Sequence, residues 1–288
     1  MSTKHKHKNK TKKTFPKDFI NKFLCGDAVQ ILKKIPNESL DLAITSPPYN
    51  IKNSTGNGLK DGRGGKWASA ALIEGYATYN DNMPHKKYVK WQREVLTEIM
   101  RILKPTGAFF YNHKWRVQAG LIQDRQDIVQ GFPVRQIIIW QRAGGINFNK
   151  GYFLPTYEVI YMIAKRGFKL APKANAVGDI WTFPQEMNNK HPAAFPIALI
   201  DRIISSTTAK TVIDPFMGSG TTALSAKKLK IDFIGIDIAK EYCKLAKERL
   251  KNFKKTGRDP FQETKKSNKK IKVQLHSDTL PLFQDADL

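Results

Sequence analysis

The stretch TVIDPFMGSGTTALSAKKLKIDFIGID at residues 211–237 decides the fold of this 288-residue chain. A short β-rich run at 211–213 leads into a turn with two glycines, and a helix-forming segment follows from Thr221. A second apolar run at 232–236 ends at Asp237. Strand, glycine turn, helix and strand in this order predict a βαβ unit, in which the two strands lie parallel.

The glycine turn has the chemistry of a ligand site. Gly218 and Gly220 permit a sharp turn and a close approach of the backbone to a ligand. Asp237 stands where doubly wound folds place an acidic side chain on ribose hydroxyls, and Asp214 opens the turn. The turn is neither G-x-G-x-x-G nor a P-loop, so a dinucleotide, a nucleoside and a purely structural turn stay open. The placement of the two aspartates and the glycines favours a ligand.

A second motif lies upstream, after another apolar run at 39–45. It reads Ser46-Pro47-Pro48-Tyr49, and its two prolines remove two N–H donors and lock the backbone. The Pro47 carbonyl and the Ser46 hydroxyl can then both face outward as acceptors beside an aromatic ring. Acceptors for an amine next to a stacking ring suit a base extruded from a nucleic acid duplex. An ordinary Pro-Pro turn with a core tyrosine is an equal alternative from these residues alone.

Helical and β-rich segments alternate along the rest of the chain. A helix capped by Asn82 is expected to begin near Pro84 and end at Lys104, with the predicted buried face Tyr88, Trp91, Val95, Ile99 and Ile102. Further helices are predicted at 196–206, from residue 221 onward, and after the 232–236 strand up to about residue 253. Strands are predicted at 39–45, 107–111, 134–140, 157–164, 211–213 and 232–236. This pattern predicts an α/β fold with a mostly parallel sheet, helices on both faces and an antiparallel hairpin from 134–140 and 157–164.

The composition favours a nucleic acid partner. The formal net charge is +24, and part of it sits in a basic arm at 1–17 and a Lys-rich tail at 257–288, both expected to be disordered. No segment is apolar enough to span a membrane, and no secretory signal follows the basic N-terminus. Cys25 and Cys243 lie in no Cys/His cluster, so we expect no metal site and a reducing cytoplasm.

Together the two motifs resemble those of the DNA amino-methyltransferases, which act on N6 of adenine or N4 of cytosine. The matching segments are S-P-P-Y at 46–49 and D-P-F-M-G-S-G-T at 214–221. The catalytic loop precedes the cofactor loop, which is the permuted order of the β group and the reverse of the order in protein-glutamine methyltransferases. Gly26-Asp27 and KHPAAFP at 190–196 are similar to two further family motifs, so the likeness covers roughly residues 22–253.

The resemblance implies a Rossmann-like fold, S-adenosyl-L-methionine as cofactor and double-stranded DNA as substrate. Ser46, Pro47, Pro48 and Tyr49 would form the catalytic loop that holds and stacks the base. His191 is interpreted as a structural histidine. The residues implied to bind the cofactor are Asp27, Asp214, Phe216, Gly218, Gly220, Thr221 and Asp237.

The implied reaction needs no covalent intermediate and no metal. Ser46 Oγ and the Pro47 carbonyl would accept the two amine hydrogens and direct the nitrogen lone pair at the methyl group. A 5-methylcytosine enzyme would need a nucleophilic cysteine in a Pro-Cys dipeptide, and the chain has none. Serine in the first position is typical of the N4-cytosine subgroup and aspartate of the N6-adenine subgroup. From Ser46 we expect cytosine as the target base. Some family members depart from this rule, so adenine is kept as the alternative.

The expected methyltransferase domain covers residues 18–256. A short insert at about 165–189 and the loop at 52–75 would read the DNA sequence, with a second subunit as a plausible aid. In the tail, Leu280–Phe283 resembles the short peptides that bind the bacterial sliding clamp; folding back onto the domain is the favoured alternative. A role in restriction-modification or in protection of phage or host DNA follows from the resemblance. A non-catalytic DNA-binding protein and an RNA methyltransferase are the competing hypotheses.

Overall fold

The computed structural model describes residues 14–50, 83–118, 120–142, 150–185 and 195–261. The tail at 262–288, with Leu280–Phe283, lies outside the described residues, as do most of the basic arm and the loop at 52–75. The elements, in chain order, are β1 (Lys22–Cys25), α1 (Ala28–Leu32), β2 (Leu40–Thr45), α2 (His85–Ile102), β3 (Leu103–His113), β4 (Arg116–Gln118), β5 (Leu121–Gln123), α3 (Gln126–Val129), β6 (Val134–Gln141), β7 (Tyr157–Ala164), the 3-10 helix η2 (Ala174–Ala176), β8 (Ile180–Thr182), α4 (Ile197–Ser205), β9 (Thr211–Asp214), α5 (Thr221–Lys228), β10 (Asp232–Asp237) and α6 (Lys240–Thr256).

One eight-stranded sheet organises the described part of the chain, in the order β1-β10-β9-β2-β3-β7-β6-β8. The five strands from β1 to β3 are mutually parallel, whereas β7 runs antiparallel to both β3 and β6. The predicted hairpin is therefore confirmed as β6 and β7. The neighbours β9 and β2 lie at the centre of the sheet. From β9 the chain continues to β10 on one side, and from β2 it continues to β3 on the other side. Open α/β sheets bind ligands at such a switch point.

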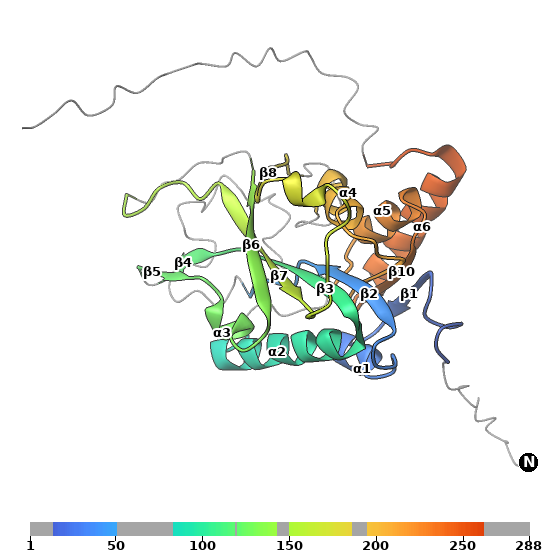
Figure 1. Cartoon of the computed structure of the whole chain (residues 1–288), viewed down its shortest axis with the longest axis horizontal. Coiled ribbons are helices and arrows are strands. Elements are labelled where there is room, and N and C mark those ends of the chain that lie inside the picture. The colour runs from blue at the N-terminus through green and yellow to red at the C-terminus, as the bar shows by residue number, and fades with distance from the viewer. Residues whose placement is uncertain (1–13, 51–82, 119, 143–149, 186–194, 262–288) are drawn as a thin grey trace, which may run out of the picture.

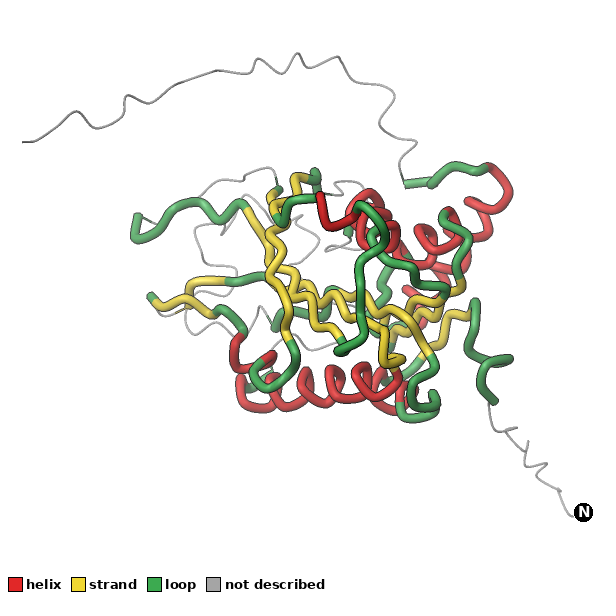
Figure 2. Tube along the Cα trace, viewed as in Figure 1, coloured by secondary structure: helices red, strands yellow, loops and turns green. Residues whose placement is uncertain are grey.

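Helices cover both faces of the sheet, as predicted (Figures 1 and 2). One face packs against α1 and α2 through an apolar cluster that includes Leu32, Val95 and Ile99. The other face packs against α4 and α5 through a cluster that includes Leu199 and Leu224. Runs such as Leu40–Thr45 are apolar almost throughout because helices bury both of their faces. No helix in the described ranges is long and apolar enough to cross a membrane.

The helix α2 has the predicted buried face, but it ends at Ile102, earlier than predicted. Tyr88, Val95, Ile99 and Ile102 are buried, and Trp91 packs at the margin of the same cluster. Pro84 occupies the N-cap position without a side-chain cap, and the predicted cap Asn82 lies outside the described residues. The strand β3 begins directly at Leu103, four residues earlier than predicted, and an irregularity beside β2 accommodates Pro105, which lacks an N–H.

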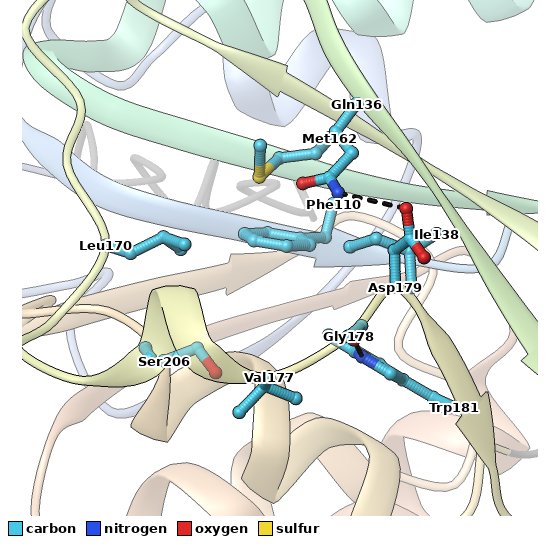
Figure 3. A pocket seen from close by; sticks show the side chains of 11 residues that line it. Phe110, Gln136, Ile138, Met162, Leu170, Val177, Gly178, Asp179, Trp181 and Ser206 are labelled. Carbon is cyan, nitrogen blue, oxygen red and sulfur yellow. Dashed lines mark hydrogen bonds between the residues drawn. The ribbon is translucent and has the colours of Figure 1, made fainter.

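Part of the predicted recognition insert belongs to the sheet. Residues 180–182 form β8, which pairs in parallel with β6, and Trp181 is buried against the α4 face. A pocket on this face is lined by Phe110, Met162 and Trp181 among others, and within the lining Gln136 donates to Asp179 (Figure 3). None of the predicted site residues lines this pocket.

Both ends of the folded part reach beyond the predicted boundaries. Phe15 packs against the core, although residues 1–17 were expected to form a disordered arm. Asp259 is buried and paired with Arg249, although the loose tail was expected to start at 257. The Phe15 ring therefore holds the segment before β1 against the core, and the ion pair of Asp259 with Arg249 holds the segment after α6.

Candidate active site

The carboxyl ends of the five parallel strands meet at one edge of the sheet and bring the predicted motifs together. Cys25, Asp237, Asp214 and Thr45 end β1, β10, β9 and β2, which lie side by side in this order. The Gly26-Asp27 turn, the glycine loop and the Pro-Pro loop therefore leave the same edge, although 168 positions separate Ser46 from Asp214 in the numbering. A ligand at this edge contacts segments that are distant in sequence.

The glycine loop is shaped by two residues in the left-handed region, Gly218 with φ 49° and Gly220 with φ 81°. A Cβ on Gly220 would lie 2.8 Å from the Cβ of Ala246 on α6, so this position needs glycine for both conformation and packing. The carboxylate of Asp237 accepts a hydrogen bond from Gly218 N at 3.0 Å and another from Ala239 N at 2.8 Å. The end of β10 thus holds the loop that follows β9.

Asp214 joins the cofactor loop to the strand that carries the catalytic loop. Its Oδ1 accepts from the Thr45 hydroxyl at 2.7 Å and from Phe216 N at 3.1 Å, and its Oδ2 accepts from the Thr222 hydroxyl at 2.7 Å. Burial raises the pKa of Asp214 to about 6 even though these donors favour the charged form. These partners lie on β2, in the glycine loop and at the start of α5, so the carboxylate links the strand that leads into the Pro-Pro loop to the glycine loop.

The remaining acidic residues of the edge are Asp237 and Asp27. Burial raises the pKa of Asp237 above its usual value, and its three backbone hydrogen bonds act in the opposite direction. Asp27 is exposed and caps α1, since its Oδ1 accepts from Gln30 N at 2.9 Å. S-adenosylmethionine carries a sulfonium and an ammonium charge together with ribose hydroxyls. Three carboxylates gathered at this edge of a chain of net charge +24 therefore fit that cofactor.

Arg249 of α6, which the sequence reasoning missed, holds the glycine loop through hydrogen bonds to Ser219 and Thr221. Its Nη1 donates to the Ser219 carbonyl at 3.2 Å, to the Ser219 hydroxyl at 3.1 Å and to the Thr221 hydroxyl at 2.9 Å. Its Nε and Nη2 form a bidentate pair with Asp259, at 3.0 and 2.6 Å. The buried Thr221 hydroxyl is thus engaged with the protein itself. Phe216 packs edge-on against Trp91 of α2, with ring centroids 5.4 Å apart.

The Pro-Pro loop is held at several points. The Tyr88 hydroxyl donates to the Pro48 carbonyl at 2.8 Å and lies 2.7 Å from His113 Nε2. Asn50, with φ 55°, exchanges two hydrogen bonds with the backbone of Met83, just before α2. The loop is therefore fixed between β2 and α2 in a defined conformation, as expected for groups that must be aimed at a substrate.

The Tyr49 side chain lies in a polar cluster that sequence reasoning missed. Tyr49 is 6% exposed, and its ring packs against His113 with centroids 4.8 Å apart. Its hydroxyl donates to Glu158 Oε2 at 2.8 Å, lies 2.5 Å from Ser46 Oγ and accepts from Asn112 Nδ2 at 2.6 Å. Glu158 is a charged residue inside the otherwise apolar run of β7, and this is the one signal in the sequence that marks it.

Of the KHPAAFP motif at 190–196, only the last two residues belong to the part of the chain that the structure describes. Residues 190–194, with His191, lie outside the described residues, whereas Phe195 is buried and Pro196 occupies the N-cap position of α4. In the described ranges no group of three or more His, Cys, Asp or Glu side chains is placed to hold a metal ion.

An open, mostly parallel sheet with a glycine loop and a Pro-Pro loop at one carboxyl edge defines a Rossmann-like, S-adenosylmethionine-dependent amino-methyltransferase. The chain belongs to the DNA methylase family whose members methylate N6 or N4 amines, because the family model described as DNA methylase matches residues 40–248. The class, the family and the DNA substrate implied by the two motifs are thereby confirmed.

Similar proteins agree with this assignment. The chain is 31% identical over 283 residues to the type II methyltransferase M.BglII of Bacillus subtilis, covering 82% of this chain and 71% of that protein. It is 32% identical to M.HpaI of Haemophilus parainfluenzae, covering 80% and 74%.

Solved structures share the fold. A putative DNA modification methylase from Thermus thermophilus, complexed with S-adenosylmethionine, matches with TM-score 0.59 and 24% identity over 81% of this chain and 93% of that one. The cytosine-N4-specific PvuII DNA methyltransferase matches with TM-score 0.61 and 19% identity over 78% of this chain and 84% of that one.

Proposed function

We propose that this enzyme transfers the methyl group of S-adenosylmethionine to N4 of cytosine in DNA. The observation that carries the proposal is Ser46, a hydroxyl residue in the first position of the catalytic loop, where aspartate is typical of adenine enzymes. N6 of adenine is the alternative, and relatives of both kinds exist: a DNA adenine methyltransferase of Escherichia coli K12 is 29% identical over 78% of this chain.

In this mechanism the bound cofactor supplies an electrophilic methyl group on its sulfonium. Ser46 Oγ and the Pro47 carbonyl accept the two amine hydrogens, so the nitrogen lone pair is directed toward that methyl group. When the cofactor binds, Asp237 would hold its ribose and Asp27 would border its adenine, and the left-handed turn at Gly218 and Gly220 would take its methionine end. The amine proton leaves to solvent after transfer, because a serine hydroxyl is not a base at neutral pH.

The base can be identified directly by mass spectrometry. Unmethylated DNA is incubated with the enzyme and deuterated S-adenosylmethionine, and its nucleosides are separated and analysed. N4-methyldeoxycytidine carrying the label is the expected product, and Ser46→Ala should reduce it strongly. Labelled N6-methyldeoxyadenosine without labelled cytosine would refute the cytosine proposal and establish the adenine alternative.

Several further roles are proposed from the motifs and the relatives. The loop order supports membership of the permuted β group. The insert at about 165–189, apart from the strand β8, and the loop at 52–75 would read the DNA sequence. The relatives are type II methyltransferases of bacteria, so a restriction-modification or DNA-protection role in bacterial cytoplasm follows. Assistance from a second subunit stays a prediction, to be tested by sedimentation.

Binding of Leu280–Phe283 to the sliding clamp also stays a prediction. A clamp pull-down tests it by comparing the intact chain with the Leu282→Ala/Phe283→Ala variant. Equal recovery of both proteins would refute clamp binding through this segment.

A further inference from the structure

A buried carboxylate lies behind the catalytic serine. Glu158 sits on β7, is 7% exposed, and faces the Pro-Pro loop across Tyr49. Its other oxygen, Oε1, lies 3.8 Å from Arg142 Nε, a distance that allows charge attraction without a hydrogen bond. Tyr49, Asn112 and Glu158 are all buried, whereas Ser46 retains some exposure. Ser46 is therefore the member of this cluster that a substrate can reach.

The donors and acceptors around the Tyr49 hydroxyl determine the direction of each hydrogen bond. Among the described residues three polar groups surround this oxygen: Glu158 Oε2 at 2.8 Å, Asn112 Nδ2 at 2.6 Å and Ser46 Oγ at 2.5 Å. An ionised carboxylate only accepts, so the single phenolic hydrogen goes to Glu158. An amide nitrogen only donates, so Tyr49 accepts from Asn112. The remaining neighbour, Ser46, must then donate its hydrogen to Tyr49.

The orientation of the Asn112 amide is itself determined by this cluster. Its Nδ2 lies 2.8 Å from Glu158 Oε2 and 3.3 Å from Ser46 Oγ, in addition to the contact with Tyr49. In the flipped amide, Oδ1 would face the carboxylate, and two acceptors would repel each other. The Asn112 Oδ1 atom is buried with no hydrogen-bond partner among the described residues, which is the cost of placing the nitrogen here.

We propose that Glu158 is a positioning residue that makes Ser46 a pure acceptor toward the substrate amine. Because Glu158 takes the hydrogen of Tyr49, and Tyr49 takes the hydrogen of Ser46, the serine oxygen presents only lone pairs on its exposed side. An amine N–H can then donate to Ser46 Oγ without competition from the serine hydrogen. If a side chain with no acceptor replaced the carboxylate, Tyr49 would turn its hydrogen toward Ser46, and the serine hydrogen would point at the amine.

This proposal rests on methyl transfer to an exocyclic amine and does not depend on which base carries it. The effect should appear in the chemical step, because Glu158 contacts neither of the residues expected to bind the cofactor ribose or adenine. A hydrogen bond to a charged group is worth enough to change a rate about 10- to 100-fold when it orients a reacting group.

The test is a double-mutant cycle of Glu158→Leu and Tyr49→Phe, measured as single-turnover transfer of tritium from labelled S-adenosylmethionine to unmethylated bacterial genomic DNA. Glu158→Leu removes the acceptor and should lower the rate about 10- to 100-fold, with cofactor affinity unchanged in calorimetry. Tyr49→Phe keeps the ring against His113 and removes only the hydroxyl. Both variants break the same chain of hydrogen bonds, which runs from Ser46 through Tyr49 to Glu158. The double variant should therefore be no slower than the slower single variant.

Controls separate positioning from folding. Glu248→Leu makes the same chemical change at an exposed position of α6 and should transfer methyl groups at the wild-type rate. If Glu158→Leu fails to fold, Tyr49→Phe alone tests the proposal, since a rate equal to wild type for that variant would overturn it. Additive losses in the double variant, or a fall in cofactor affinity as large as the fall in rate, would also overturn it. Total tritium is counted, so a methylated adenine would refute the cytosine proposal and leave this one intact.

Discussion

The substitution Asp259→Asn tests whether the chain beyond α6 supports the cofactor loop. The side chains of Arg249 and Asp259 are 1% and 3% exposed, and two parallel hydrogen bonds join them at 3.0 and 2.6 Å. Asparagine has nearly the same shape, but it removes the negative charge and turns an N–H₂ group toward the guanidinium. The variant therefore leaves a buried positive charge without its counterion.

Breaking a buried ion pair in this way costs about 3–5 kcal/mol of the free energy of unfolding. For a domain of this size each kcal/mol lowers Tm by about 2–4 °C, so the expected fall in Tm is about 6–20 °C. Cofactor affinity should fall as well, because Arg249 Nη1 also holds Ser219 and Thr221 of the glycine loop. Circular dichroism gives Tm, and titration calorimetry with S-adenosylmethionine gives Kd.

Two comparisons make this prediction decisive. Asp179→Asn makes the same change at an exposed carboxylate and should leave Tm and cofactor affinity unchanged. A chain ending after Gly257 should behave like Asp259→Asn, whereas one ending after Phe261, whose ring lies 4.5 Å from the Arg249 guanidinium carbon, should behave like the full chain. An Asp259→Asn protein that melts and binds cofactor like the Asp179→Asn control would refute the reasoning.

Three further predictions concern charge. The pKa of Asp214 is raised to about 6, so the folded state holds this proton more tightly than the unfolded chain, and the stability that the proton confers is lost as pH rises from about 4 to about 6. Urea unfolding across this window should therefore show wild type losing up to about 3 kcal/mol relative to Asp214→Asn, and parallel curves would contradict the assignment. Asp237→Ala should weaken S-adenosylmethionine binding by about 1.5–3 kcal/mol in calorimetry, and unchanged affinity in a folded variant would remove Asp237 from the cofactor site. Deleting residues 2–14 should weaken DNA binding and reduce its dependence on salt without changing the methylated sequence, because phosphate contacts carry no base information; an altered sequence would exclude this role.

The sequence predicted the features whose causes are local. The glycine turn at 214–221 needs residues that tolerate positive φ, and its flanking apolar runs are long enough to be strands in their own right. The helix α2 follows from the spacing of its apolar residues, and the hairpin of β6 and β7 from two adjacent β-rich runs. In each case the residues that determine the conformation lie within one element, so their order in the chain is sufficient information.

Element ends and the site's supporting residues depended on tertiary structure. Pro105 did not delay β3, because Leu103 pairs with Leu40 of β2 and the register shift before Ala108 leaves Pro105 without a ladder partner. Asp259 joined the fold because α6 brings Arg249 to it. Glu158 lies 109 residues from Tyr49, and only the placement of β7 two strands from β2 brings them into contact. The sequence by itself determined the class of protein and the two loops that carry its chemistry. Only the folded chain decided which buried charges orient those loops, because a single charged residue has no local pattern and acquires its partner through the packing of distant elements.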